Sequence, residues 1–155
     1  MRKAIFISAF VITLLLSVPG SGQRNVQPAF DPILEADARH NLDVARQAFG
    51  PARKAYKQVL LRFEETFAAY PEFSGMDEFL YLAGMSSYYL SKNEGKQKVN
   101  LKKEREREKY APEKLRADAV AYLSGLLEKY PETPRRAEVE KLLSELKAST
   151  AKNEP

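Results

Sequence analysis

The stretch 126–134 reads Leu-Leu-Glu-Lys-Tyr-Pro-Glu-Thr-Pro, and a related pattern lies 60 residues earlier in the 155-residue chain. The matching positions are Phe63, Phe67, Tyr70, Pro71 and Glu72 with Leu123, Leu127, Tyr130, Pro131 and Glu132. The segments that follow also correspond, with Phe79, Leu82, Ala83 and Ser86 opposite Val139, Leu142, Leu143 and Leu146. An amphipathic helix that ends in Tyr-Pro-Glu, a short turn and a second amphipathic helix therefore occur twice.

Apolar residues at helical spacing extend this pattern over most of the chain. They recur every three or four positions in segments 33–49, 52–69, 77–91, 113–129 and 134–148, and no segment alternates with the period of two that marks a strand. A single helix pair cannot bury such an apolar stripe alone, so neighbouring pairs must stack. The sequence predicts an all-α fold, a short tetratricopeptide-like helical repeat of about five helices and two to two and a half repeats.

The dipeptide Gly50-Pro51 interrupts the helical pattern between the first two segments. Glycine is favoured just past the end of a helix, and proline is favoured in the first turn of the next one. We therefore expect two helices that meet here, with one long helix kinked at the proline as the alternative.

A strongly charged stretch, residues 92–110, separates the two copies of the pattern. Its centre, 102–109, reads Lys-Lys-Glu-Arg-Glu-Arg-Glu-Lys, and opposite charges three residues apart favour a solvated helix. The repeat spacing of 60 exceeds the roughly 34 residues of a tetratricopeptide unit, and the charged stretch accounts for most of the excess as an insertion between units. An alternative interpretation makes it a docking arm for an acidic partner or an anionic envelope polymer.

The first 22 residues have the layout of a secretory signal peptide. Arg2 and Lys3 precede an apolar run of 15 residues, 4–18, which is followed by Pro19 and three small residues. We expect cleavage near Gly22, with an uncleaved N-terminal anchor as the alternative. The predicted organisation is a signal peptide (1–22), a disordered leader (23–30), a repeat domain (31–148) and a disordered tail (149–155), in an exported protein of the periplasm that associates with the outer membrane.

The composition argues against several kinds of chemistry. The chain has no cysteine and one histidine, His40, so there is no basis for thiolate chemistry or a cysteine metal site. Adjacent carboxylates such as Glu64-Glu65 point in different directions on a helix and form no catalytic pair. Without the predicted signal peptide, 23 basic residues face 21 acidic ones, too even a balance for nucleic-acid binding. We expect a non-enzyme without a metal, a cofactor or a small-molecule substrate.

Tyrosines gather on segment 77–91. Successive residues of a helix are about 100° apart, so Tyr81 and Tyr88 share a face while Tyr89 points away. Tyrosine is common at interfaces because it combines a large apolar ring with a hydroxyl group. We predict that Tyr81, Tyr88 and Lys92 line a concave face that grips an extended or helical peptide, with packing between repeats as the alternative role of the rings.

Three strings carry a resemblance to a known family: Ala-Tyr-Pro-Glu-Phe-Ser (69–74), Phe-Leu-Tyr-Leu-Ala-Gly-Met-Ser-Ser-Tyr-Tyr-Leu (79–90) and Leu-Leu-Glu-Lys-Tyr-Pro-Glu-Thr-Pro (126–134). They resemble the tetratricopeptide repeats of the BamD-like outer-membrane assembly proteins, over residues 37–148. The resemblance implies a periplasmic, non-catalytic, protein-binding scaffold. Its implied partners are envelope proteins, including components of the machine that inserts β-barrel proteins, and any membrane association would come through such a partner.

Overall fold

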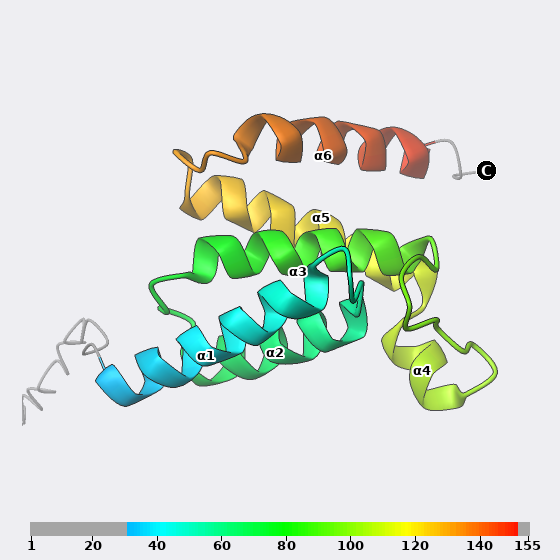
Figure 1. Ribbon diagram of the computed structural model, residues 1–155. Coiled ribbons are helices and arrows are strands. Elements are labelled where there is room, and N and C mark those ends of the chain that lie inside the picture. The colour runs from blue at the N-terminus through cyan, green and yellow to red at the C-terminus, as the bar shows by residue number, and fades with distance from the viewer. Residues whose placement is uncertain (1–30, 152–155) are drawn as a thin grey trace, which may run out of the picture.

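The computed structural model describes residues 31–151, and within this range every regular element is a helix (Figure 1). The elements are α1 (Pro32–Phe49), α2 (Tyr56–Ala69), α3 (Met76–Ser91), α4 (Glu104–Lys109), α5 (Pro112–Lys129) and α6 (Arg136–Ala151). The predicted all-α, short helical-repeat fold is confirmed. The predicted signal peptide (1–22), the predicted leader (23–30) and the last four residues of the predicted tail lie outside the described range.

The five long helices alternate in direction and stack as hairpins (Figure 1). The first hairpin is α1 with α2, and the second is α3 with α5, which form the most extensive helix–helix contact. The last helix, α6, packs on α5 as half of a further unit. The charged insertion connects α3 to α5. It therefore lies between the two copies of the repeated pattern, α2 with α3 and α5 with α6, and within the hairpin that α3 and α5 form.

The two Tyr-Pro-Glu turns have the same backbone hydrogen bonds. In the first turn the amides of Tyr70 and Phe73 donate to the carbonyls of Thr66 and Tyr70, at 2.8 and 3.2 Å. In the second, the equivalent bonds from Tyr130 and Thr133 are 2.9 and 3.1 Å long. Both tyrosines leave the helical region, with ψ angles of 75° for Tyr70 and 67° for Tyr130, and the proline that follows each one disfavours the helical conformation. The repeat seen in the sequence is therefore a repeat of structure.

Residues of the hydrophobic core also correspond between the two copies of the repeat. Phe63 of α2 and Leu123 of α5 occupy equivalent positions in the repeat and are both buried. Phe63 lies at the centre of the aromatic packing: its ring centroid is 5.7 Å from that of Phe79 on α3 and 4.8 Å from that of Tyr122 on α5. One side chain thus joins three helices from two hairpins.

The second hairpin packs closely because Gly84 of α3 has no side chain. A Cβ atom at this position would lie 2.6 Å from both Cγ and Cδ2 of Leu123, well inside van der Waals contact. Gly84 is therefore required for the contact between α3 and α5.

The first two helices are separate, as expected, and the single kinked helix is wrong. Asp31 caps α1 by accepting hydrogen bonds from the amides of Ile33 and Leu34, at 2.9 and 3.2 Å. The second helix begins at Tyr56, four residues later than predicted, because residues 51–53 form a turn and Lys54 adopts a φ of 45°. A residue with positive φ cannot continue a right-handed helix.

The final helix closes the stack with a polar outer surface. Its four apolar residues Val139, Leu142, Leu143 and Leu146 are buried, whereas Glu140, Lys141, Ser144 and Glu145 are exposed. Terminal repeats normally need such a polar outer face. The helix continues to Ala151, three residues beyond the predicted end of the repeat domain at 148.

Candidate functional site

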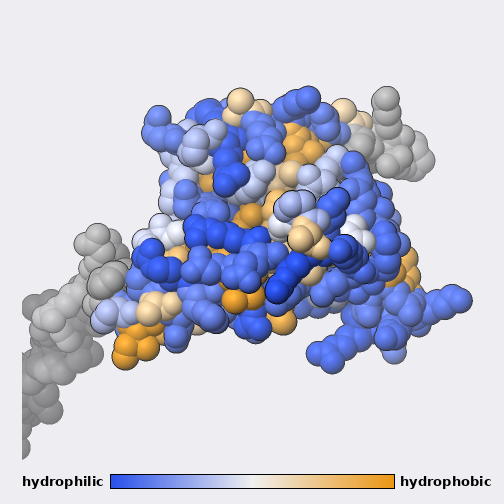
Figure 2. Space-filling view, in the orientation of Figure 1, coloured by the Kyte–Doolittle hydropathy of each residue, from blue (hydrophilic) through white to orange (hydrophobic). Residues whose placement is uncertain are grey.

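One side of α3 faces the space between α1 and α6 (Figure 1). The residues on this side are spaced three or four apart, as the positions of one helix face must be: Glu78, Tyr81, Met85, Tyr88 and Lys92. We call them the α3 face. In the space-filling view, hydrophobic atoms appear in the strip between α6 and α1, with hydrophilic atoms on both sides (Figure 2). All three predicted site residues belong to this face.

At the N-terminal end of the α3 face, an ion pair links α1 to α3. Nε and Nη2 of Arg46 donate to the two carboxylate oxygens of Glu78, at 2.9 and 2.5 Å, and Nη1 donates to Asp43 at 2.7 Å. The hydrogen bonds from Arg46 hold the pKa of Glu78 below its ordinary value. A bidentate arginine–carboxylate pair fixes geometry as well as charge, and this one links the last turn of α1 to the first turn of α3.

Tyr81 lies in the contact between α3 and α6. Its hydroxyl donates to Glu138 at 2.9 Å, and the guanidinium carbon of Arg135 lies 4.0 Å from its ring centroid. Burial, reinforced by the hydrogen bond to Glu138, raises the pKa of Tyr81 to about 12. The residue is only 7% exposed. A partner would reach the Tyr81 ring only if Arg135 moved, so this residue packs between repeats in the structure.

Tyr88 and Lys92 form the accessible end of the α3 face. Nζ of Lys92 donates to the Tyr88 hydroxyl at 2.5 Å and lies 4.1 Å from the centroid of its ring. This hydrogen bond raises the pKa of Lys92, which therefore stays charged. Tyr88 is half-buried, Lys92 is exposed, and the back of the cluster is formed by Tyr89, whose centroid is 5.6 Å from that of Tyr88. The structure thus brings together two of the three predicted residues.

Sequence reasoning missed the charged side chains that other segments contribute beside α3, namely Arg46 of α1, Arg135 of the turn before α6 and Glu138 of α6. The spacing of Glu78 and Tyr81 places them on one helix face, and this signal was available. The approach of Arg46 and Arg135 from other parts of the chain could not be predicted, because helical periodicity says nothing of which elements become neighbours.

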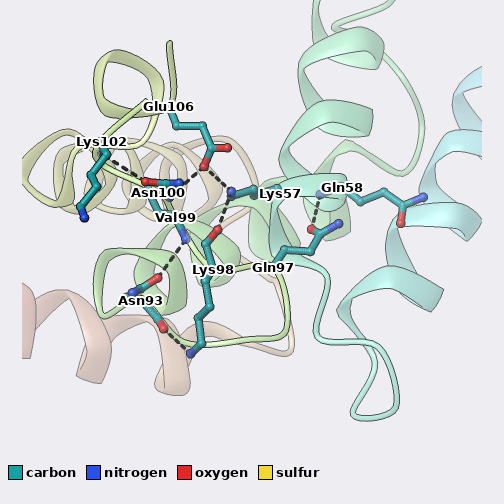
Figure 3. Close-up of polar contacts among 9 residues, drawn as sticks. All are labelled: Lys57, Gln58, Asn93, Gln97, Lys98, Val99, Asn100, Lys102 and Glu106. Atoms are coloured by element: carbon teal, nitrogen blue, oxygen red, sulfur yellow. Dashed lines mark hydrogen bonds and ion pairs between the residues drawn. The ribbon is translucent and has the colours of Figure 1, made fainter. Parts of the chain in front are cut away.

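The charged insertion is bound to α2 by its own polar residues (Figure 3). Nζ of Lys57 donates to Glu106 at 2.6 Å and to the carbonyl of Lys98 at 2.8 Å, and the same carboxylate accepts the Asn100 amide at 2.9 Å. Lys109 pairs with Glu64 at 2.6 Å. Within the insertion, only Glu104–Lys109 are helical. Glu106 pairs with Lys57 of α2 and not with Lys103, the basic residue three positions before it. The insertion is thus a docked loop with one short helix.

Glycine at position 95 allows this docking. Gly95 has a φ of 91°, and a Cβ there would lie 2.7 Å from both the Lys54 carbonyl oxygen and Cδ2 of Tyr56. The next amide, that of Lys96, donates to the same carbonyl at 3.1 Å. The insertion therefore begins in direct backbone contact with the loop between α1 and α2.

Substitution of Glu106 by glutamine is expected to loosen the insertion locally without unfolding the repeats. The hydrogen bond from the Asn100 amide, with that from Lys57, lowers the pKa of Glu106. Docking through the ionised carboxylate is therefore complete when the pH is above the ordinary pKa of a glutamate. It is lost as the pH falls through the lowered pKa of Glu106. In the wild type the Asn100 amide proton should titrate with that carboxylate by NMR, and its hydrogen exchange should be faster in Glu106→Gln.

Glu108 provides the matched control, since it is an exposed glutamate of the same short helix. Glu108→Gln should leave the Asn100 amide unchanged in both its chemical shift and its exchange. An equal response to the two substitutions would show that Glu106 has no special part in the docking.

Residues 31–151 contain no group of three or more His, Cys, Asp or Glu side chains arranged to hold a metal ion. In the same range, no helix combines the length and the apolar character needed to cross a membrane. His40, the single histidine of the chain, is exposed on α1.

Comparison of the chain with protein-family models, with curated proteins and with solved structures gives no significant match. The resemblance to BamD-like proteins stays a prediction.

Proposed function

We propose that this protein is a non-catalytic, protein-binding scaffold of the bacterial cell envelope, comparable in role to the BamD-like component of outer-membrane β-barrel assembly. The observation that carries the proposal is the pair Tyr88–Lys92 on the α3 face. It places an aromatic ring and a positive charge side by side at the accessible end of a helical-repeat surface. The sequence resemblance and the predicted signal peptide supply the compartment and the class of partner.

The properties of this pair suit recognition of an extended or helical peptide. The Tyr88 ring and its hydroxyl offer apolar area and a hydrogen-bonding group. Lys92 is folded onto the ring by a single hydrogen bond of 2.5 Å, so it can turn to a carboxylate or a backbone carbonyl of a partner. Glu78 and Tyr81 already bond to Arg46 and Glu138, and we assign them to holding the neighbouring helices.

The test is photocrosslinking in the native envelope with a photoreactive phenylalanine analogue in place of Tyr88. Captured proteins are identified by mass spectrometry. We expect a defined product that contains a component of the β-barrel assembly machinery, and we expect Lys92→Glu in the same chain to reduce its yield. Because Lys92 is exposed, its substitution should leave the fold intact, and circular dichroism would check this.

Phe67 is the matched control position. It is an aromatic residue on α2, outside the α3 face, and is 46% exposed. The same analogue at Phe67 should not give the product seen from Tyr88. Identical products from both positions would show that capture reflects general proximity, and the proposed binding face would then be rejected.

A further inference from the structure

Positive charge is concentrated in the insertion. Residues 92–110 contain eight Lys or Arg against four Glu, a net charge of +4. The remainder of the described chain, residues 31–91 and 111–151, contains 13 Lys or Arg against 16 Asp or Glu, a net charge of −3. The nearly even balance of the whole sequence therefore conceals a strong separation of charge within the fold.

Docking leaves this charge separation at the surface of the insertion, because it withdraws one charge of each sign: Glu106 bonds to Lys57 and Lys109 pairs with Glu64. Glu106 is turned towards α2, where Lys57 and the Asn100 amide bind its carboxylate. Its neighbours Arg105 and Arg107 are exposed, as are Lys102 and Lys103. In Figure 3 the Lys102 side chain extends away from the polar network. The glutamates Glu94, Glu104 and Glu108 are also exposed, but the exposed lysines and arginines of the insertion outnumber them.

The loop between α1 and α2 enlarges the same basic surface. Nζ of Lys96 donates to the Ala52 carbonyl at 2.6 Å, which brings the insertion against this loop. Arg53 and Lys54 are exposed there. We call the combined surface the basic pole, which consists of Arg53, Lys54, Lys96, Lys98, Lys102, Lys103, Arg105 and Arg107.

An apolar residue projects from the basic pole. Leu101 is 45% exposed and lies in the turn closed by the hydrogen bond from the Lys103 amide to the Asn100 carbonyl, at 3.0 Å. The Asn100 side chain supports the same turn by accepting the Lys102 amide at 3.1 Å. A leucine followed by two exposed lysines thus sits in an ordered turn.

The opposite end of the molecule is acidic. It contains the start of α1 and both Tyr-Pro-Glu turns (Figure 1), with Asp31, Asp37, Glu72, Asp77 and Glu132 among its residues. A molecule with separated charge of this kind orients itself in an external field. A negatively charged surface would attract the basic pole and repel the acidic end.

We propose that the basic pole docks this protein directly on a bilayer that contains anionic phospholipid, with Leu101 entering the interface. Clustered lysines and arginines are attracted to anionic headgroups, and apolar side chains beside them bury in the headgroup region. A soluble polyanion would use the charges but would leave Leu101 in water. The exposed leucine is the observation that favours a lipid surface. This site is separate from the α3 face.

The experiment measures partition coefficients of the full chain on vesicles of phosphatidylcholine and on vesicles that also contain phosphatidylglycerol. The variants are Lys102→Glu/Lys103→Glu and Leu101→Ser. The apolar segment 4–18 is present in every protein compared, so its contribution cancels in each ratio of wild type to variant. The lysine variant should lower the partition coefficient on anionic vesicles by about thirtyfold, and the leucine variant by about fivefold.

Salt and a control variant complete the test. The preference of the wild type for anionic vesicles should disappear at high ionic strength, where the Debye length falls to about 3–4 Å. Lys129→Glu/Lys141→Glu changes the same charge at two exposed lysines of α5 and α6, outside the basic pole, and should have little effect. Circular dichroism should show the same helix content in all variants.

Two outcomes would overturn the proposal. If the lysine variant and its control reduced binding equally, the effect would be one of net charge and not of the basic pole. If Leu101→Ser bound anionic vesicles as well as the wild type and a soluble polyanion such as polyphosphate competed fully, the site would be one for polyanions and not for a lipid surface.

Discussion

Replacement of Phe63 by alanine is expected to lower the free energy of unfolding by about 3–5 kcal/mol, the usual cost of removing a fully buried aromatic ring. The side chain is 2% exposed and packs on rings from α3 and α5. The cavity would open between two hairpins, and a short repeat has no further units to compensate for a weakened junction. Chemical denaturation followed by circular dichroism measures the change.

Phe67 supplies the control for this substitution, one helical turn further along α2. Its ring stacks on Phe63 with centroids 5.4 Å apart, but the residue is 46% exposed. Phe67→Ala should therefore cost about 1 kcal/mol or less, because most surface substitutions have small effects. Similar losses from the two alanine substitutions would show that Phe63 does not have the central position that the structure gives it.

The fold was largely predictable because the sequence features that determine it are local and occur twice in the chain. Tyr70-Pro71 and Tyr130-Pro131 end helices through backbone preferences of a few residues, and the apolar spacing on each side defines the buried faces. Boundaries that depend on long-range contacts were less predictable. The start of α2 at Tyr56 depends on a loop whose Lys54 carbonyl accepts a hydrogen bond from the Lys96 amide of the insertion. No feature of residues 50–56 predicts this contact.

In the candidate site, too, local features were predictable and long-range contacts were not. Helical periodicity correctly placed Tyr81 and Tyr88 on one face of α3, but it could not distinguish their surroundings. Arg135 and Glu138, which cover Tyr81, come from the turn before α6 and from α6 itself, more than 50 residues away in the sequence. Lys92 lies four residues after Tyr88, so that pair was within reach of local reasoning.

The insertion was misread for a related reason. Alternating charges three residues apart fit a free helix with its own ion pairs. In the structure, Lys57 and Glu64 of α2 offer Glu106 and Lys109 better partners. Because α3 and α5 form one hairpin around the insertion, both ends of the loop are fixed, and the loop is kept beside the helix that supplies those partners.

Substitution of Gly84 by alanine is expected to destabilise the protein by about 1–3 kcal/mol, the usual cost of overpacking. Alanine is the better helix former by up to about 1 kcal/mol, so helix propensity alone predicts the opposite sign. The steric effect should win because the new Cβ would lie 2.6 Å from Leu123, which is itself fully buried at 0% exposure. The measurement is again chemical denaturation.

Gly125 of α5 is the decisive control, since it too lies inside a helix but a Cβ there would meet no atom within 4 Å. Gly125→Ala should therefore stabilise the protein by about 0.5–1 kcal/mol. Leu123→Ala should also cost less in the Gly84→Ala background than in the wild type, because the truncated side chain makes room for the new methyl group. If both glycine substitutions stabilised the protein, α3 and α5 would not be in the close contact on which the second hairpin depends.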